Sequence, residues 1–176
     1  MNTRIHLRLA CLVVINFLAV FGGIAFSSDT LKSGQNAFHY SLANGIVVNL
    51  LIVVEPHQSN SSSKFSPYSI WGAVDSPPKQ VVRQFCIRIN SESVSLIESS
   101  YTDLGEPREI SAFLKDKDVW VELVGSDAGG AYLCQWHFRY SKGLESFVLE
   151  ERIVHLMEFP QVSEKTTFTY NERTDL

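Results

Sequence analysis

Residues 118–155, DVWVELVGSDAGGAYLCQWHFRYSKGLESFVLEERIVH, decide the fold class. From residue 132 to residue 140, every second position is apolar or aromatic, and the positions between them are more polar. The apolar positions are Tyr132, Cys134, Trp136, Phe138 and Tyr140. Because neighbouring side chains of a strand point to opposite faces, this pattern predicts a strand with one face on a core.

The segments on either side extend this strand into an antiparallel meander. Residues 119–124 are apolar in both phases apart from Glu122, which predicts a strand inside a sheet rather than at its edge. Residues 125–130 form a glycine-rich connecting loop, and the turn at residues 141–143 leads into a third strand.

The rest of the chain supplies further short strands. Residues 46–54 (IVVNLLIVV) indicate a buried strand, and residues 81–90 (VVRQFCIRIN) place Phe85, Ile87 and Ile89 on one face of a hairpin. Further strands are expected at residues 68–74, 109–114 and 166–170, while residues 29–44 are polar and weakly patterned. Residues 149–157 fit a helix as well, although a strand is favoured. We therefore expect a mostly antiparallel β domain of roughly seven to nine strands, either a sandwich or a small barrel.

The amino terminus has the layout of a secretory signal peptide. Arg4, His6 and Arg8 precede a charge-free apolar stretch at residues 9–26, which ends in small residues around Ser27. The prediction is a helical signal segment at residues 1–27, cleaved after Ser27, and a single exported β domain at residues 28–176 with a serine-rich loop at residues 57–67. The alternative is an uncleaved membrane anchor, because the apolar stretch just reaches bilayer-spanning length.

Charge and cysteine content narrow the possible partners. The formal net charge is −4, and an acidic chain without a basic stripe repels polyanions, so nucleic acid is not an expected partner. A membrane is expected as a partner only through an uncleaved amino-terminal segment. Cys86 and Cys134 remain after removal of the signal, and an exported location permits a disulfide between them.

The sequence contains no recognisable metal-binding, phosphate-binding or catalytic motif. The histidines show no metal-ligand spacing, and the glycine-rich loop lacks the phosphate-binding patterns, so neither a metal nor a cofactor is predicted. The sequence has no nucleophile elbow, so no catalytic residue is assigned. His137 lies in the polar phase of its strand, which predicts an exposed side chain.

Three functional hypotheses remain for an exported protein of the periplasm, the cell envelope or the extracellular space. The leading hypothesis is a non-catalytic interaction or accessory domain with a protein partner in the envelope. The alternative is a carrier for a small apolar ligand, with a cavity lined by Tyr132, Trp136 and Phe138. The third is a hydrolase, which would need His137 or His155 beside an acid in a cleft.

Overall fold

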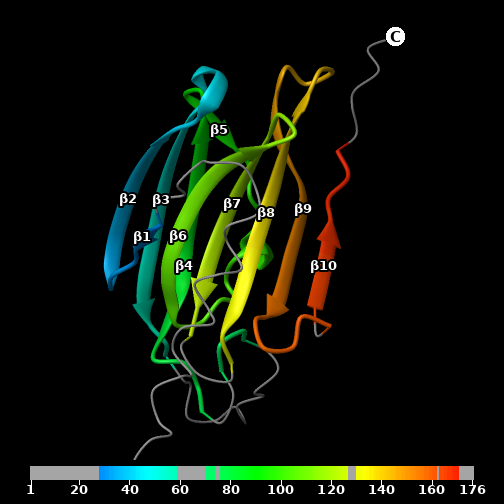
Figure 1. Ribbon diagram of the computed structural model, residues 1–176. Helices are drawn as coiled ribbons and strands as arrows, with labels where there is room; N and C mark the ends of the chain where they lie inside the picture. Colours follow the sequence, from blue (N-terminus) through cyan, green and yellow to red (C-terminus); the bar gives the residue numbers. More distant parts are fainter. Residues whose placement is uncertain (1–27, 59–69, 74–75, 127–129, 162, 171–176) are drawn as a thin grey trace, which may run out of the picture.

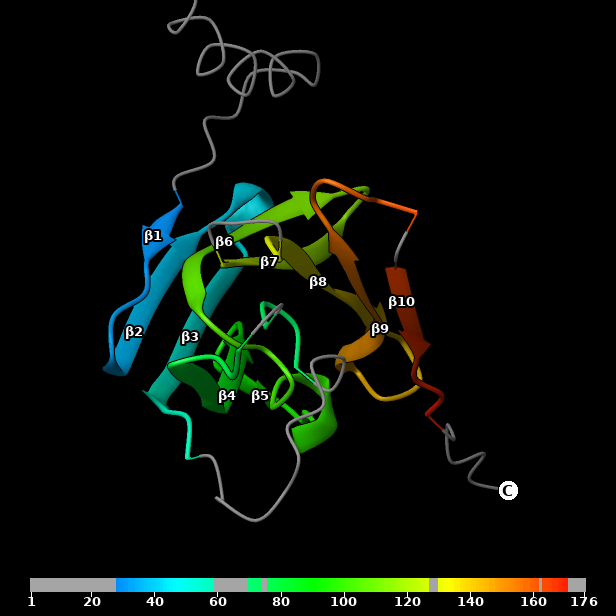
Figure 2. The same ribbon diagram turned by 90° about the horizontal axis from the view of Figure 1, so that it is seen from below.

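The computed structural model describes residues 28–58, 70–73, 76–126, 130–161 and 163–170. Within these residues the chain is mostly β and forms two antiparallel sheets, an arrangement consistent with a sandwich (Figures 1 and 2). The six-stranded sheet has the order β1 (Asp29–Thr30), β6 (Pro107–Lys115), β7 (Asp118–Gly125), β8 (Tyr132–Ser141), β9 (Ser146–Leu156) and β10 (Ser163–Thr167). The four-stranded sheet has the order β2 (Gly34–Ser41), β3 (Val47–Pro56), β4 (Gln80–Ile89) and β5 (Glu92–Val94).

Helical structure in the described residues is limited to two short 3-10 segments, η2 (Ala43–Gly45) and η3 (Glu98–Ser100). None of the described helices has the length and apolar character needed to cross a membrane. The predicted signal segment at residues 1–27 lies outside the described residues.

The hydrophobic core lies between the two sheets. Residues Val48, Leu50 and Ile52 of β3 are at most 2% exposed, and they belong to the same buried cluster as Val121 of β7. An edge-to-face contact between Phe85 of β4 and Trp136 of β8, with ring centroids 4.7 Å apart, joins the two layers. Alternation along β3, β4, β7 and β8 therefore places one face of each strand on this core.

Two of the hairpins use tight turns that the sequence can support. Asn90 and Ser91 connect β4 to β5, and Asp116 and Lys117 connect β6 to β7. All four have positive φ angles, between 51° and 77°. Two successive residues of positive φ match the twist of the flanking strands, and Asn and Asp tolerate this conformation better than most residues.

The connection between β5 and β6, residues 95–106, is held against the six-stranded sheet by buried side chains. The indole Nε1 of Trp136 donates to the carbonyl oxygen of Ser100 at 2.9 Å. The hydroxyl of Tyr132 donates to the carbonyl oxygen of Gly105, also at 2.9 Å. These two aromatic side chains thus fill the core and also satisfy backbone oxygens that the connection would otherwise leave unpaired.

Arg152 of β9 makes the third contact with this connection. Its side chain is 2% exposed, and its Nη2 donates to both carboxylate oxygens of Asp103 at 2.6 and 2.8 Å. Its Nη1 donates to Glu164 of β10 at 3.1 Å, while its Nε is buried without a hydrogen-bond partner. A buried guanidinium is stable only when it is paired, so Arg152 and Asp103 fix the connection to β9.

The structure confirms the antiparallel meander of β7, β8 and β9, and it makes β9 a strand rather than a helix. The last strand begins at Ser163, three residues earlier than predicted. The sequence did not predict β2, because only Phe38 and Tyr40 mark its inner face clearly. Of the predicted strand at residues 68–74, only residues 70–73 are described, and there Trp71 makes a single isolated bridge with Leu104.

Candidate functional site

A row of four polar side chains crosses the outer face of the four-stranded sheet. The strand registers pair His39 of β2 with Asn49 of β3, Asn49 with Arg88 of β4, and Arg88 with Ser93 of β5. Residues that are directly opposite in antiparallel strands share a face, so these four side chains lie side by side. These four residues form the polar row.

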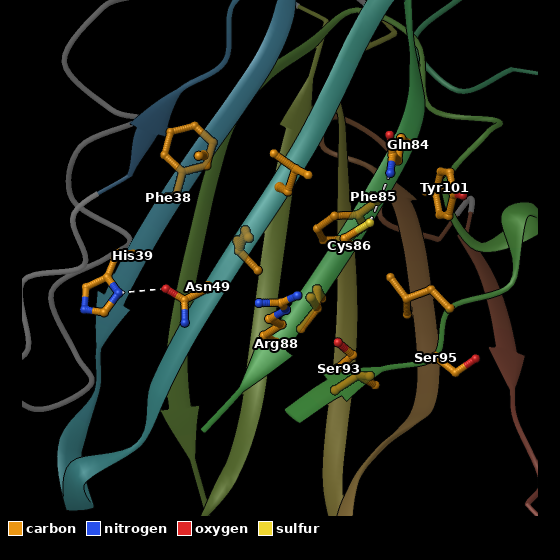
Figure 3. A pocket seen from close by; sticks show the side chains of 16 residues that line it. Phe38, His39, Asn49, Gln84, Phe85, Cys86, Arg88, Ser93, Ser95 and Tyr101 are labelled. Carbon is orange, nitrogen blue, oxygen red and sulfur yellow. Dashed lines mark hydrogen bonds between the residues drawn. The ribbon is translucent and has the colours of Figure 1, made fainter. Parts of the chain in front are cut away.

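The polar row lies in a hollow of about 840 Å³ that is open to solvent (Figure 3). The hollow forms because β5 is only three residues long and covers β4 only opposite residues 87–89. Beyond β5 the border is made by Ser95, Leu96 and Tyr101. The ring of Tyr101 packs edge-to-face against Phe85 at 6.2 Å and is 7% exposed, so it closes this end of the hollow as a fixed wall.

Hydrogen bonds within the polar row set the direction of its donors. The Nδ1 of His39 lies 2.8 Å from the Oδ1 of Asn49, as Figure 3 shows. Because a carbonyl oxygen can only accept, His39 donates and the amide nitrogen of Asn49 is left to face the remaining row. On the other side of the imidazole, the hydroxyl of Ser41 lies 3.4 Å from Nε2.

A second, less polar row runs beside the polar row, two residues along each strand. It consists of Ala37, Leu51 and Cys86, which the registers pair in the same way. The amide nitrogen of Gln84 donates to the sulfur of Cys86 at 3.3 Å (Figure 3). The hollow therefore offers hydrogen-bond donors on one side and apolar contact on the other.

The outer face of the six-stranded sheet is also charged, but there Arg139 and Lys165 are paired with carboxylates. The ring of His137 lies between carboxylates, with Nε2 2.8 Å from Asp118 and Nδ1 3.4 Å from Glu150. Arg139 pairs with Glu150 at 2.9 Å, and Lys165 pairs with Glu151 at 2.5 Å. Arg139 and Lys165 of this face thus each have a carboxylate partner.

His137 is buried, so the prediction of an exposed side chain is wrong. Its imidazole stacks on the indole of Trp120, with ring centroids 4.3 Å apart and an angle of 8° between the planes, and the residue is 9% exposed. Alternation does point His137 away from the core. The neighbouring strands β7 and β9 supply the residues that cover it, and the sequence pattern of β8 does not reveal them.

The geometry at His137 differs from that of a hydrolase. A catalytic histidine offers one ring nitrogen to an orienting acid and the other to a nucleophile. Here both ring nitrogens face carboxylates, and neither is hydrogen-bonded to a serine or cysteine of the described chain. In the same part of the chain, no group of three His, Cys, Asp or Glu residues is placed to hold a metal ion.

The candidate ligand-binding residues lie in the core rather than along the hollow. Tyr132, Trp136 and Phe138 are 0% exposed and belong to the buried cluster between the sheets. None of them lines the hollow on the four-stranded sheet. Tyr140, which continues the same series, is 48% exposed near the tip of the β8–β9 hairpin, where its ring contacts Phe147.

The two cysteines lie in different environments. Cys86 is exposed on the outer face of the four-stranded sheet, whereas Cys134 is buried in the core. Both thiols are free, so the predicted disulfide is not formed in this structure. Burial raises the pKa of the Cys134 thiol well above its usual range, which keeps this thiol neutral.

The sequence contains a partial signal for the polar row. Asn49 and Arg88 are polar residues in the outward phase of two strands that the sequence predicts. Their phase follows from alternation, but their alignment with His39 and Ser93 depends on strand registers, which the sequence leaves open.

A scan against protein-family models finds no match to this chain, and searches of the curated proteins and of the solved structures find none either.

Proposed function

We propose that this chain is an exported, non-catalytic interaction domain of the cell envelope and that it binds a protein partner in the hollow on its four-stranded sheet. The observation that carries the proposal is the polar row. It gathers donors from four strands in one open hollow, and the described chain offers Arg88 no carboxylate within ion-pair distance. Polar groups gathered in one open hollow are a common feature of binding surfaces.

The contrast between the two outer faces supports the choice of site. On the six-stranded sheet, Arg139 and Lys165 already have carboxylate partners. A partner that binds there must replace existing ion pairs, whereas a partner that binds in the hollow can contact Arg88 without displacing a carboxylate of the described residues. The openness of the hollow favours a protein segment over an enclosed small molecule, because small-ligand sites cover most of the ligand surface.

The carrier and hydrolase alternatives have less support. The carrier hypothesis needs Tyr132, Trp136 and Phe138 to border a cavity, and all three are packed in the core. The hydrolase hypothesis needs a free nitrogen on His137, and both of its ring nitrogens face carboxylates.

The binding proposal can be tested with a random heptapeptide library selected on the purified protein. The enriched peptides are titrated into the ¹⁵N-labelled protein, and shifts of its amide resonances map the contact surface. We expect the largest shifts at Asn49, Arg88 and Ser93. Shifts confined to Trp120, Glu122 and their neighbours would move the site to the other sheet, and a selection without enrichment would contradict the proposal.

Export has a separate test, because it rests on residues 1–27 alone. Amino-terminal sequencing of the protein recovered from cell fractions should give Ser28 as the first residue. Recovery of Met1 in a membrane fraction would replace the cleaved signal by a membrane anchor.

A further inference from the structure

The hollow contains one cation, Arg88, whose pairing differs from that of the arginines on the other sheet. Arg139 pairs with Glu150, and Arg152 pairs with Asp103 and Glu164. Arg88 is exposed, and no carboxylate of the described residues lies within ion-pair distance of it. In a chain with 19 acidic and 15 basic side chains, a surface arginine without an acidic neighbour marks a local reversal of charge.

The neighbours of Arg88 in the polar row are donors as well. His39 occupies the Oδ1 of Asn49, so the amide nitrogen of Asn49 is the end that remains for a ligand. On the other side lies the hydroxyl of Ser93. Adjacent strands are about 4.8 Å apart, so these groups form a short line of donors around one guanidinium. The ligand group that such a line fits is a carboxylate, which accepts two parallel hydrogen bonds from arginine.

The less polar row adds a requirement for an apolar group. Leu51 and Cys86 lie two residues along β3 and β4 from Asn49 and Arg88, which is about 6.7 Å in a strand. An extended peptide has the same spacing between side chains i and i+2. A peptide that runs along the strands can therefore place an acidic side chain at Arg88 and an apolar side chain on Leu51.

From this geometry we infer that the partner presents an acidic peptide segment, in which a carboxylate pairs with Arg88 and an apolar side chain two residues away packs on Leu51 and Cys86. The inference rests on the proposed function and adds the chemistry of the partner. A single carboxylate bound at an exposed arginine gains little in water, so the apolar contact supplies the rest of the affinity. Nucleic acid fits less well, because it would bring a charge with every phosphate to a chain of net charge −4, whereas the proposed contact needs one carboxylate.

The test uses two acetylated and amidated peptides, Ser-Gly-Glu-Ser-Leu-Gly-Ser and the same peptide with Gln in place of Glu. Each is titrated into the ¹⁵N-labelled protein, and the dissociation constant is taken from the amide shifts of Asn49, Arg88 and Ser93. The Glu peptide should bind about two- to fivefold more tightly than the Gln peptide, the factor for one exposed ion pair of about 0.5 to 1 kcal/mol.

Substitutions test whether the difference in affinity between the two peptides depends on Arg88. Arg88→Gln should abolish the preference for Glu, and Arg88→Lys should keep only part of it, because lysine lacks the planar fork. Arg83→Gln is the matched control: Arg83 is an exposed arginine of the same strand that does not line the hollow, so its loss should leave both constants unchanged. The amide spectra of the variants also report whether the fold is retained.

The outcomes separate this inference from the proposed function. Equal binding of both peptides in the hollow overturns the inference and leaves the proposed function in place. The same holds if neither peptide binds while library-selected peptides occupy the hollow without dependence on Arg88. Shifts confined to residues outside the hollow, for these peptides and for the selected ones, overturn both.

Discussion

The buried pair of Arg152 and Asp103 should be a large contributor to the stability of the sandwich. In Arg152→Met, the methionine side chain fills the space of the aliphatic part of the arginine, but both hydrogen bonds to Asp103 are lost. Hydrogen bonds to charged groups contribute about 1.5 to 3 kcal/mol each, and breaking a buried pair costs about 3 to 5 kcal/mol. Asp103 is 27% exposed and regains some water, and the bond to the 52% exposed Glu164 adds little. We therefore expect a loss of about 3 kcal/mol, a large share of the roughly 5 to 15 kcal/mol of a typical domain.

Urea denaturation followed by tryptophan fluorescence and far-UV circular dichroism measures this loss. The midpoint should fall while the slope of the free energy of unfolding with urea stays the same, because the fold is retained. Arg139→Met is the matched control: Arg139 is 60% exposed in its ion pair with Glu150, so the expected loss is below about 0.5 kcal/mol. In the double variant Arg152→Met, Asp103→Leu, no buried charge is left alone, and the total loss should be smaller than the sum of the two single losses. A loss below about 1 kcal/mol for Arg152→Met, or additive single losses, would refute the reasoning.

Three further substitutions test the packing of β7 and β8, each by the same denaturant titration. Trp136→Ala should cost about 3 to 5 kcal/mol, because it removes a fully buried indole and its hydrogen bond; a loss near 1 kcal/mol would place this side chain outside the core. Gly125→Ala should cost about 1 to 3 kcal/mol, because the added methyl group overlaps the ring of Tyr132, and a variant as stable as the parent would contradict this packing. His137→Ala should cost about 1 to 2 kcal/mol through lost stacking on Trp120 and a lost carboxylate contact, whereas a solvated face predicts less than about 0.5 kcal/mol.

Alternation predicted which side chains face the core, but it could not predict which strands are neighbours. The meander of β7, β8 and β9 was predictable because its strands follow one another through short turns. The apolar phases of β4 and β8 were likewise visible in the sequence. The partition of the strands into a four-stranded and a six-stranded sheet depends on long-range pairing, for which a single sequence carries no direct signal.

The alignment of the candidate site also depends on strand pairing that the sequence does not reveal. His39, Asn49, Arg88 and Ser93 come from four strands and are aligned only by three separate registers. The first of these strands, β2, was not predicted, because its inward positions include Gly34 and Asn36 and so interrupt the apolar phase. The hollow itself exists because β5 stops after three residues, and the end of a short strand is the least predictable part of a sequence pattern.

The position of β1 has a consequence for the order in which the chain assembles. β1 opens the described chain, yet it pairs with β6, and Ser28 contacts Glu109 across a separation of 81 residues. During synthesis this amino-terminal segment has no partner until β6 has been made, and closing so long a loop slows the step. Until β1 pairs with it, β6 presents an unpaired edge at residues 108–110, which is a template for pairing with another chain. A protein shortened to begin at residue 34 would keep both sheets but lose Leu31 from the core and expose this edge permanently, and it should self-associate at concentrations where the full chain does not.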